Sequence, residues 1–258
     1  MKNKISVVKI GGSIINNTSF LNELISDFIA INQAKIIIHG GGSIVSEMNE
    51  KLGIKNRLNK GRRITTSEVL DTAIMVYSGN INKNIVSKLQ AKNCNALGLT
   101  GCDANTILAK KRSNKPIDFG YVGNVKQVNS NSIKCFIDLG ITPVFCSITH
   151  DGNGQLFNTN ADTIASEIAI SMTNHYDVEL IYCSNKKGVL QNPKDDDSLI
   201  HCITTKKYLE LLENQIITDG MLPKLQNCFN ALNNKVGKVS ITNYQGLKYN
   251  NKVTKIML

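Results

Sequence analysis

Short apolar runs alternate with clusters of glycine in the first 42 residues of this chain. The run Ile5–Ile10 is rich in β-branched residues and leads into Gly11 and Gly12. The run Lys35–His39 leads into three glycines that end at Gly42. A segment with the apolar spacing of a helix follows each cluster. Strand, glycine turn and helix in repetition are typical of a parallel sheet with crossover helices, so the pattern predicts an α/β fold.

The rest of the chain continues this alternation. Helices are predicted at Phe20–Asn32, Ile44–Leu52, Ser67–Lys92 with a break near Gly79, Asp162–Met172, Lys206–Asn214 and Leu222–Asn233. Strands are predicted at Asn95–Gly101, Ile141–Ser147, Val178–Cys183 and Lys238–Thr242, and a hairpin or lobed loop at Lys111–Val125. Asn160 or Thr159 is placed to cap the helix that begins near Asp162. Polar residues at Thr173–Tyr176 indicate a boundary between an N-terminal lobe, residues 1–173, and a C-terminal lobe, residues 174–258.

Composition narrows the class of protein. A chain of 258 residues, 41% of them hydrophobic, is long enough for one large domain or two joined lobes. No apolar run reaches the roughly 18 residues that span a bilayer, and no leader precedes the first strand, so we expect a cytoplasmic protein with no membrane partner. The seven cysteines are scattered without a CxxC pair, which favours reduced, mostly buried thiols over disulfides or zinc.

The formal net charge of +10 raises the question of nucleic acid. The excess is almost all lysine, and the arginines are Arg57, Arg62, Arg63 and Arg112. Arginine is the usual reader of bases and phosphates, and no basic run is interleaved with aromatic residues. Nucleic acid is therefore not an expected partner.

The glycine turns are candidates for phosphate binding. Glycine lets the backbone approach a ligand closely, and its N–H groups can hold oxyanions at the start of a helix. The same turns also serve as tight connections in any α/β fold, and this reading stays open. The sequence lacks the GxxxxGK[ST] pattern of a P-loop, a GxGxxG after the first strand, and the HRD and DFG motifs of protein kinases.

Five motifs occur in a defined order: VVKIGGS (Val7–Ser13), IIIHGGG (Ile36–Gly42), GRRIT (Gly61–Thr65), NTNAD (Asn158–Asp162) and ITDGMLPKL (Ile217–Leu225). Together they resemble the acetylglutamate kinases of the amino acid kinase family, over almost the whole chain. The resemblance implies a three-layer αβα sandwich with an open, mainly parallel sheet. It implies an N-terminal lobe for acyl-glutamate binding and dimerisation, and a C-terminal lobe for ATP.

The implied activity is ATP-dependent phosphorylation of the side-chain carboxylate of an N-acylated glutamate, in arginine biosynthesis. Asn95–Gly101 and Leu180–Leu190 resemble a subgroup that uses a succinyl group, so N-acetyl-L-glutamate and N-succinyl-L-glutamate both stay open. A carboxylate is already ionised at pH 7 and needs no strong base. The obstacle is the approach of one anion to another, which positioned cations can overcome.

The resemblance also implies roles for individual residues. Lys9 and Lys224 would flank the transferring phosphoryl group, and Asp162 would hold both lysines. The acyl-glutamate would contact Gly41, Gly42, Arg63 and Asn158. The nucleotide would contact Gly11, Gly12, Ser184, Lys187, Gly188, Asp219 and Gly220. Mg²⁺ would accompany ATP, held mainly by phosphate oxygens and water, so no protein metal ligands are expected.

Two stretches depart from the family pattern. No acidic residue follows Ser184 in the nucleotide loop, which leaves the adenine and ribose contacts open. Lys252–Leu258 lacks a Gly-Thr pair, which puts the contribution of the last strand in doubt. We interpret His39 as structural and Asp195–Asp197 as a solvated loop instead of a metal site.

Two alternative functions stay open. One is another amino acid kinase, acting on carbamate, aspartate, free glutamate or UMP. The other is a non-catalytic ligand-sensing relic of the fold, although such a relic should have lost a lysine or Asp162. Arginine-inhibited relatives carry an extra N-terminal helix that builds a hexamer, and only about eight residues precede Lys9 here. We therefore expect a homodimer without arginine feedback.

Overall fold

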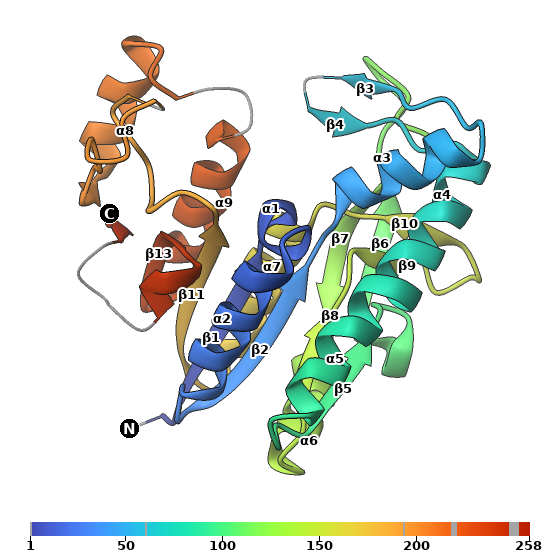
Figure 1. Cartoon of the computed structure of the whole chain (residues 1–258), viewed down its shortest axis with the longest axis horizontal. Helices are drawn as coiled ribbons and strands as arrows, with labels where there is room; N and C mark the ends of the chain where they lie inside the picture. The colour runs from blue at the N-terminus through green and yellow to red at the C-terminus, as the bar shows by residue number, and fades with distance from the viewer. Residues whose placement is uncertain (1, 60, 193, 218–220, 248–252) are drawn as a thin grey trace.

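An eight-stranded sheet runs through the whole molecule (Figure 1). The computed structural model describes residues 2–59, 61–192, 194–217, 221–247 and 253–258. The strands lie in the order β12 (Cys202–Ile203), β14 (Thr254–Ile256), β13 (Lys238–Asn243), β11 (Asp177–Ser184), β1 (Lys4–Ile10), β2 (Ala34–His39), β8 (Thr142–Phe145) and β5 (Ala96–Leu99). Within this sheet of described residues, only β13 and β14 pair antiparallel. The predicted open, mainly parallel sheet is confirmed.

The central strand β1 is buried on both faces, as expected of a parallel sheet covered by helices. Ile5 and Val7 pack into one hydrophobic core, and Val8 and Ile10 pack into another. The first core is completed by α6 (Ser130–Asp138), α7 (Ala161–Met172), α8 (Thr205–Glu213) and α9 (Met221–Asn233). The second is completed by α2 (Thr18–Ile29), α3 (Gly42–Lys51), α4 (Ser67–Ile74) and α5 (Asn82–Gln90). The molecule is thus the predicted αβα sandwich.

Two smaller β structures lie beside the main sheet. One sheet has the order β10 (Leu156–Asn158), β9 (Ile148–His150), β6 (Ile107–Lys111) and β7 (Gly123–Val128). Its β6–β7 hairpin confirms the hairpin predicted around Lys111–Val125. The other is the short hairpin of β3 (Leu58–Asn59) and β4 (Arg62–Arg63), which lies beyond the carboxyl ends of β1 and β2 (Figure 1).

Three details differ from the sequence-based expectation. Residues 67–90 are helical throughout, because the predicted break near Gly79 is a π-helical segment, Met75–Ile81, between α4 and α5. Helix α6 was not predicted, since Ile133 alone is fully buried among its residues. The last strand, β14, does form in spite of the missing Gly-Thr pair, with Thr254 buried and bound to the Val189 N–H.

All seven cysteines are free thiols, and four of them are buried. Among the described residues, no helix combines the length and apolar character needed to cross a membrane.

Candidate active site

Two lysines from distant parts of the chain meet at one carboxylate. The Lys9 Nζ atom lies 2.6 Å from Oδ1 of Asp162, and the Lys224 Nζ donates a hydrogen bond to Oδ2 at 2.8 Å. The three side chains are only 12%, 14% and 15% exposed for Lys9, Lys224 and Asp162. The structure therefore brings together all three residues predicted to be catalytic.

The start of α7 fixes Asp162. Asn160 is the N-cap, and its side chain accepts a hydrogen bond from the Thr163 N–H at 3.0 Å. Asp162 lies in the first turn, where the helix dipole favours a negative charge. The hydroxyl of Tyr182 on β11 donates to the Asp162 backbone oxygen at 3.0 Å. Of the two predicted caps, Asn160 is the one observed.

Neighbouring residues position the two lysines relative to α7. Lys9 lies on β1 directly beside Tyr182 of β11 in the parallel ladder. The Lys224 ammonium lies 5.1 Å from the centre of the Tyr182 ring, within cation–π range. A hydrogen bond from Ser166 to the Asn227 backbone oxygen joins α7 to α9. Tyr182 and the contact between α7 and α9 thus help to position Lys9, Asp162 and Lys224, which we call the triad.

Burial and charge act in opposition on this triad. Burial alone would raise the pKa of Asp162, but the charges and hydrogen bonds of Lys9 and Lys224 outweigh it and hold that pKa well below its ordinary value. Burial lowers the pKa of Lys9, and the Lys224 charge adds to that effect while Asp162 opposes it. The Asp162 carboxylate is therefore ionised. The charged form of Lys9 is disfavoured by burial, and a further anion bound nearby would stabilise it.

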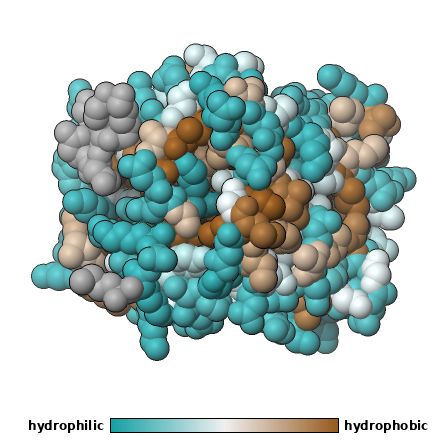
Figure 2. Space-filling view, turned by 90° about the horizontal axis from the view of Figure 1, so that it is seen from below, coloured by the Kyte–Doolittle hydropathy of each residue, from teal (hydrophilic) through white to brown (hydrophobic). Residues whose placement is uncertain are grey.

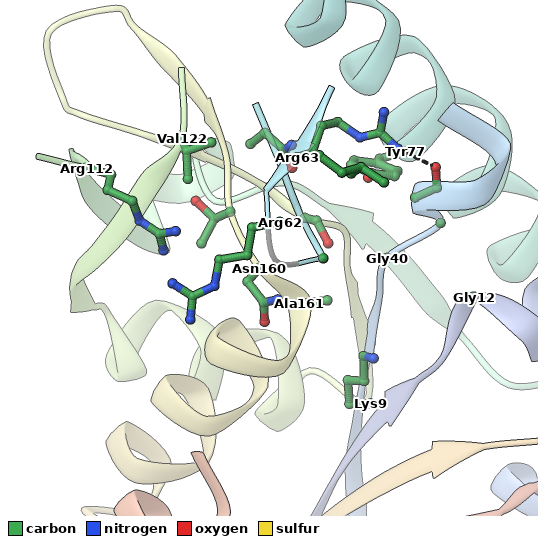
Figure 3. Close-up of a pocket in the computed structure, with 17 residues that line it drawn as sticks. Lys9, Gly12, Gly40, Arg62, Arg63, Tyr77, Arg112, Val122, Asn160 and Ala161 are labelled. Atoms are coloured by element: carbon green, nitrogen blue, oxygen red, sulfur yellow. Dashed lines mark hydrogen bonds between the residues drawn. The ribbon is translucent and has the colours of Figure 1, made fainter. Parts of the chain in front are cut away.

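Lys9 opens onto a cavity of about 270 Å³, close to the lower end of the range for ligand pockets (Figure 3). The lining residues come from β1, the glycine turns, the β3–β4 hairpin, the π-helical segment, the loop between β6 and β7, the end of β8, β10 and the start of α7. They are Lys9, Gly12, Gly40, Gly41, Gly42, Leu58, Gly61, Arg62, Arg63, Tyr77, Arg112, Val122, Ser147, Asn158, Thr159, Asn160 and Ala161. All four residues predicted to contact the acyl-glutamate are in this set.

Arg63 is held firmly at one wall of the cavity. Its guanidinium donates hydrogen bonds of 2.7 Å to Asn56 Oδ1, to the Gly42 backbone oxygen and to Ser46 Oγ. These bonds use three of the five N–H groups of the guanidinium, which leaves two to bind a carboxylate. The predicted substrate role is therefore compatible with an additional structural role in anchoring the start of α3.

Gly41 could not be replaced without rearrangement. Its φ of +143° is a conformation that side-chain-bearing residues rarely adopt, and an added Cβ would lie 2.1 Å from Ile81 Cδ1. The π-helical segment that carries Ile81 therefore packs directly on the glycine turn. This contact shapes the turn that leads into α3 and exposes Gly41 and Gly42 to the cavity.

Asn158 on β10 contributes from the opposite side. Its backbone N–H donates to the Tyr121 oxygen at 3.0 Å, and its Nδ2 donates to Thr65 Oγ1 at 3.1 Å. The side chain is thereby oriented by residues of the neighbouring loops, and it lines the cavity. The turn or cap that such an asparagine usually forms is absent at this position, where it is a strand residue.

The residues predicted to bind nucleotide cluster in part. The Gly11 N–H donates to the Cys183 oxygen at 2.8 Å, so the first glycine turn lies against the end of β11, next to Ser184. Gly188 packs so closely on Thr254 that an added Cβ would lie 2.4 Å from its Oγ1, which is by itself a sufficient reason for glycine. Asp219 and Gly220 lie outside the described residues.

Two lysines of the predicted nucleotide loop form ion pairs with the acidic loop at residues 195–197. Lys186 lies 2.8 Å from Asp196 Oδ1, and Lys187 lies 3.1 Å from Asp197 Oδ1. All four side chains are substantially exposed. Asp196 and Asp197 thus act as partners of the lysines, in agreement with the interpretation of 195–197 as a solvated loop.

His39 is a structural residue, as expected. Burial lowers its pKa to about 4, so the ring is neutral at pH 7. A neutral ring with Nδ1 protonated can donate to the Gly40 oxygen at 3.0 Å and accept from Asn82 Nδ2 at 3.1 Å. Asn82 also donates to the Val144 oxygen. This network joins the end of β2 to α5 and β8.

Several cavity residues were not identified from the sequence. Arg62, Tyr77, Arg112 and Ser147 line the cavity beside the predicted set. Burial raises the pKa of the Tyr77 hydroxyl to about 12. One signal was available: arginine is rare in this lysine-rich chain, and three of its four arginines line this cavity.

Comparison with known proteins identifies the family of this chain. The model of the amino acid kinase family matches residues 4–243. The acetylglutamate kinase of Phocaeicola vulgatus is 47% identical over 242 residues, which cover 94% of each chain. The acetylglutamate kinase of Cytophaga hutchinsonii is 46% identical over 95% of this chain and 93% of its own. The crystal structure of smu.665 from Streptococcus mutans superposes with a TM-score of 0.81 at 26% identity, over 94% of this chain and 95% of that chain.

Proposed function

This chain belongs to the amino acid kinase family, and we propose that it is the kinase that phosphorylates the side-chain carboxylate of an N-acyl-L-glutamate in arginine biosynthesis. N-acetyl-L-glutamate is the acceptor indicated by the name of its relatives. The observation that carries the proposal is the position of Asp162 between Lys9 and Lys224, beside the cavity onto which Lys9 opens.

The proposed reaction is a direct transfer. The ionised side-chain carboxylate of the acceptor attacks the γ-phosphorus of ATP, an oxygen–phosphorus bond forms, and the bond to the β-phosphate oxygen breaks. The products are an acyl phosphate and ADP. Because the nucleophile carries no proton at pH 7, no general base is required. This agrees with a site in which the buried carboxylate of Asp162 is already paired with two lysines and is not free to act as a base.

Lys9 and Lys224 supply the electrostatic part of catalysis. Phosphoryl transfer depends mainly on positioning and on stabilisation of the charge spread over the transferring group. Asp162 orients both ammonium groups before the substrates arrive, so little reorganisation is needed during the reaction. The low pKa of Asp162 keeps this anchor charged throughout the physiological range.

The remaining assignments concern the two substrates. Gly41, Gly42, Arg63 and Asn158 bind the acyl-glutamate in the N-terminal lobe. Arg63 keeps free N–H groups for the α-carboxylate, for which a guanidinium is well matched.

The C-terminal lobe binds ATP. Gly11, Gly12, Ser184, Lys187 and Gly188, together with Asp219 and Gly220, contribute to its site. Mg²⁺ enters with ATP and is held mainly by phosphate oxygens and water.

The experiment that tests the proposal traps the acyl phosphate. Purified protein is incubated with MgATP, N-acetyl-L-glutamate and hydroxylamine, and hydroxamate and ADP are measured together. Lys9→Ala and Lys224→Ala should each lower kcat on the order of 10²-fold, as expected for the loss of one transition-state donor. Lys126→Ala, an exposed lysine on β7, is the matched control and should retain full activity.

The outcomes separate the alternative functions. Hydroxamate formed from another carboxylate or from carbamate, but not from an acyl-glutamate, would identify a different amino acid kinase. Binding of acyl-glutamate without any ADP would identify a non-catalytic relic of the fold. Near-normal kcat in both lysine variants would contradict the roles given to them.

We further propose a cytoplasmic homodimer joined at the β5 edge of the sheet. No described strand pairs with the outer side of β5, and an unpaired edge is ready to join another strand. Leu97 on β5 and Leu139 after α6 are 36% and 73% exposed. Figure 2 views the molecule from the end where β5 and α6 lie and shows apolar residues gathered in a mainly hydrophilic surface. Seven free thiols suit a reducing compartment.

A further inference from the structure

A buried tyrosine adjoins all three residues of the triad. Tyr182 lies near the carboxyl end of β11 and is only 1% exposed. In the parallel ladder it lies directly beside Lys9 of β1. Its ring lies close to the Lys224 ammonium, and its hydroxyl is bonded to the backbone of Asp162. Tyr182 is therefore placed to influence the position of each member of the triad.

The triad carries one more positive charge than negative charge. The single carboxylate of Asp162 is shared between the Lys9 ammonium at 2.6 Å and the Lys224 ammonium at 2.8 Å. Among the described residues, no other carboxylate lies within ion-pair distance of either lysine. Two cations that share one anion repel each other, and the Lys224 charge contributes to the lowered pKa of Lys9. A second attractive partner would help to hold both ammonium groups beside Asp162.

The ring of Tyr182 is such a partner for Lys224. The Lys224 Nζ atom lies 5.1 Å from the ring centre, inside the limit of about 6 Å for a cation–π interaction. The lysine side chain is 14% exposed and the tyrosine is buried, so water screens this attraction only weakly. No ring in the described part of the chain makes such a contact with Lys9. The two lysines are thus held differently, Lys9 by a carboxylate and Lys224 by a carboxylate and a ring.

The hydroxyl of Tyr182 makes a hydrogen bond that is partly redundant. It donates to the Asp162 backbone oxygen at 3.0 Å, and because burial raises the pKa of Tyr182 well above 10.0, it stays a neutral donor. The same backbone oxygen lies in the first turn of α7, where it also accepts a hydrogen bond within the helix. Asn160 caps this helix independently through its hydrogen bond from the Thr163 N–H. Loss of the hydroxyl should therefore disturb the triad less than loss of the ring.

We propose that Tyr182 is a positioning residue whose ring, more than its hydroxyl, holds the Lys224 ammonium beside the transferring phosphoryl group. This inference rests on the proposed function, in which Lys224 is a stabilising cation. Tyr182 is not among the residues that line the cavity, so it acts through Lys224 and not on a substrate. Its contribution should appear in kcat, since the ammonium must be in place when charge develops on the transferring group.

Two substitutions separate the ring from the hydroxyl. Tyr182→Phe keeps the ring and should retain kcat within about 3-fold of wild type. Tyr182→Leu removes the ring as well and should lower kcat about 10–30-fold, as expected for the loss of a desolvated cation–π contact. The KM values for ATP and for the acyl-glutamate should change no more than about 3-fold in either variant. An equal loss of kcat in both variants would assign the effect to the hydroxyl and overturn the role of the ring.

Tyr176 provides the matched control. It is a buried tyrosine of the same hydrophobic core, but it precedes the first residue of β11, whereas Tyr182 lies near the last. Roughly 20 Å of strand separates the two side chains. Tyr176→Leu removes the same atoms from the core and should retain kcat within about 3-fold. A loss equal to that of Tyr182→Leu would mean that core packing accounts for the effect, and would overturn the proposal.

A graded series of rings tests the nature of the contact. Phenylalanine, difluorophenylalanine and trifluorophenylalanine at position 182 have similar shapes, but fluorine withdraws electron density from the ring face that attracts a cation. The logarithm of kcat should fall with each addition of fluorine, while the melting temperature stays nearly constant. Equal kcat across the series would show that the ring does not attract the Lys224 charge, and would overturn the proposal.

A double substitution tests whether Tyr182 acts through Lys224. In the Lys224→Ala background, Tyr182→Leu should lower kcat no more than about 3-fold further, because the cation that the ring holds is already absent. An undiminished effect in this background would show that Tyr182 acts on another group.

The positioning role and the proposed function can fail separately. A wild type that forms the acyl phosphate, together with a Tyr182→Leu variant of full kcat, would refute the positioning role alone. A wild type that forms no acyl phosphate from any acyl-glutamate would refute the proposed function itself.

Discussion

At the scale of single residues, Asp162 is the centre of the site. As a helix-stabilising residue in the first turn of α7, it would contribute roughly 0.3–1 kcal/mol to folding. As the partner of two buried lysines, it also determines where their charges lie. These two roles predict different consequences for one conservative substitution.

We expect Asp162→Asn to fold and to lose most of its kcat. The amide keeps the size of the side chain but removes the charge that orients Lys9 and Lys224, and the two ammonium groups then repel each other. The expected loss of kcat is on the order of 10²-fold or more, measured by steady-state kinetics together with circular dichroism. Asn160→Ser, which keeps a capping side chain, is the control for the helix start. Intact kcat in Asp162→Asn would show that the charge does not organise the lysines.

The pKa of Lys9 should determine the pH at which activity is lost on the alkaline side. Burial lowers this pKa below the ordinary 10.5, and in the proposed mechanism Lys9 acts only while it is protonated. As pH rises through the lowered pKa, the cation is lost, so kcat/KM should decline at a pH below 10.5. The profile of kcat, which reports the substrate complex, should decline at a higher pH because ATP stabilises the cation. In the Lys9→Arg variant, the activity that remains should no longer decline at alkaline pH. An unchanged alkaline decline in this variant would show that another group causes it.

Asp162 acts at the other end of the pH scale. Its folded-state pKa is depressed, so its contribution to folding is complete above the ordinary carboxyl pKa of 3.8. That contribution is lost only as pH falls through the depressed value. The triad therefore sets no acid limit near neutrality.

At the scale of elements, the second glycine turn depends on the π-helical segment that packs on it. Gly41→Ala should lower the free energy of unfolding by at least about 2 kcal/mol, from backbone strain and from the contact with Ile81. Gly53→Ala is the matched control, since Gly53 also has a positive φ (+72°) but nothing within 4 Å of an added Cβ. That variant should lose about 1–2 kcal/mol, from strain alone.

A double substitution isolates the contact between the two elements. Ile81→Val removes the Cδ1 atom that meets the new Cβ. The Gly41→Ala/Ile81→Val variant should therefore be less destabilised than the sum of the two single variants in urea unfolding. Simple additivity would mean that strain in the backbone, and not the clash, accounts for the cost.

The elements were also the most predictable part of the structure. The strands at residues 4–10, 34–39 and 177–184 were expected because strands buried on both faces read as continuous apolar runs. Helix α6 and the two-residue strands were not, because few of their residues are buried. Gly79 was interpreted as a break because glycine weakens a helix, but it lies inside the continuous π-helical segment.

The site was predictable only through resemblance. Lys9, Asp162 and Lys224 are far apart in the sequence, and no local pattern states that their side chains meet. The direction of Arg62 depends on a short hairpin that the sequence did not predict, and Arg112 lies in a loop without periodicity. Tyr77 reads as an ordinary core residue of a helix. These contacts follow from how the sheets and loops pack, and this information is absent from local spacing.

At the scale of the whole molecule, the open edge at β5 determines the expected assembly. Light scattering should give twice the chain mass of 28.3 kDa. Leu97→Glu places a charge at that edge and should shift the protein toward the monomer, because a buried unpaired charge opposes association. Leu209→Glu alters an exposed leucine of α8, near the other end of the sheet, and should leave the dimer intact. A monomeric wild type, or equal effects of both variants, would rule out this interface.

Lys186 and Lys187 each have a carboxylate of their own chain as a partner. A phosphate group that binds Lys187 would therefore displace the carboxylate of Asp197. An unpaired lysine would instead release a bound counterion from solution, so fewer counterions are released here. Added potassium chloride weakens the Lys187–Asp197 ion pair as well as the interaction of Lys187 with phosphate, since salt screens both. The affinity for ATP should therefore depend on ionic strength less steeply than the net charge of +10 would indicate. In Asp197→Asn, whose lysine has lost its tethered partner, the same titration should become steeper.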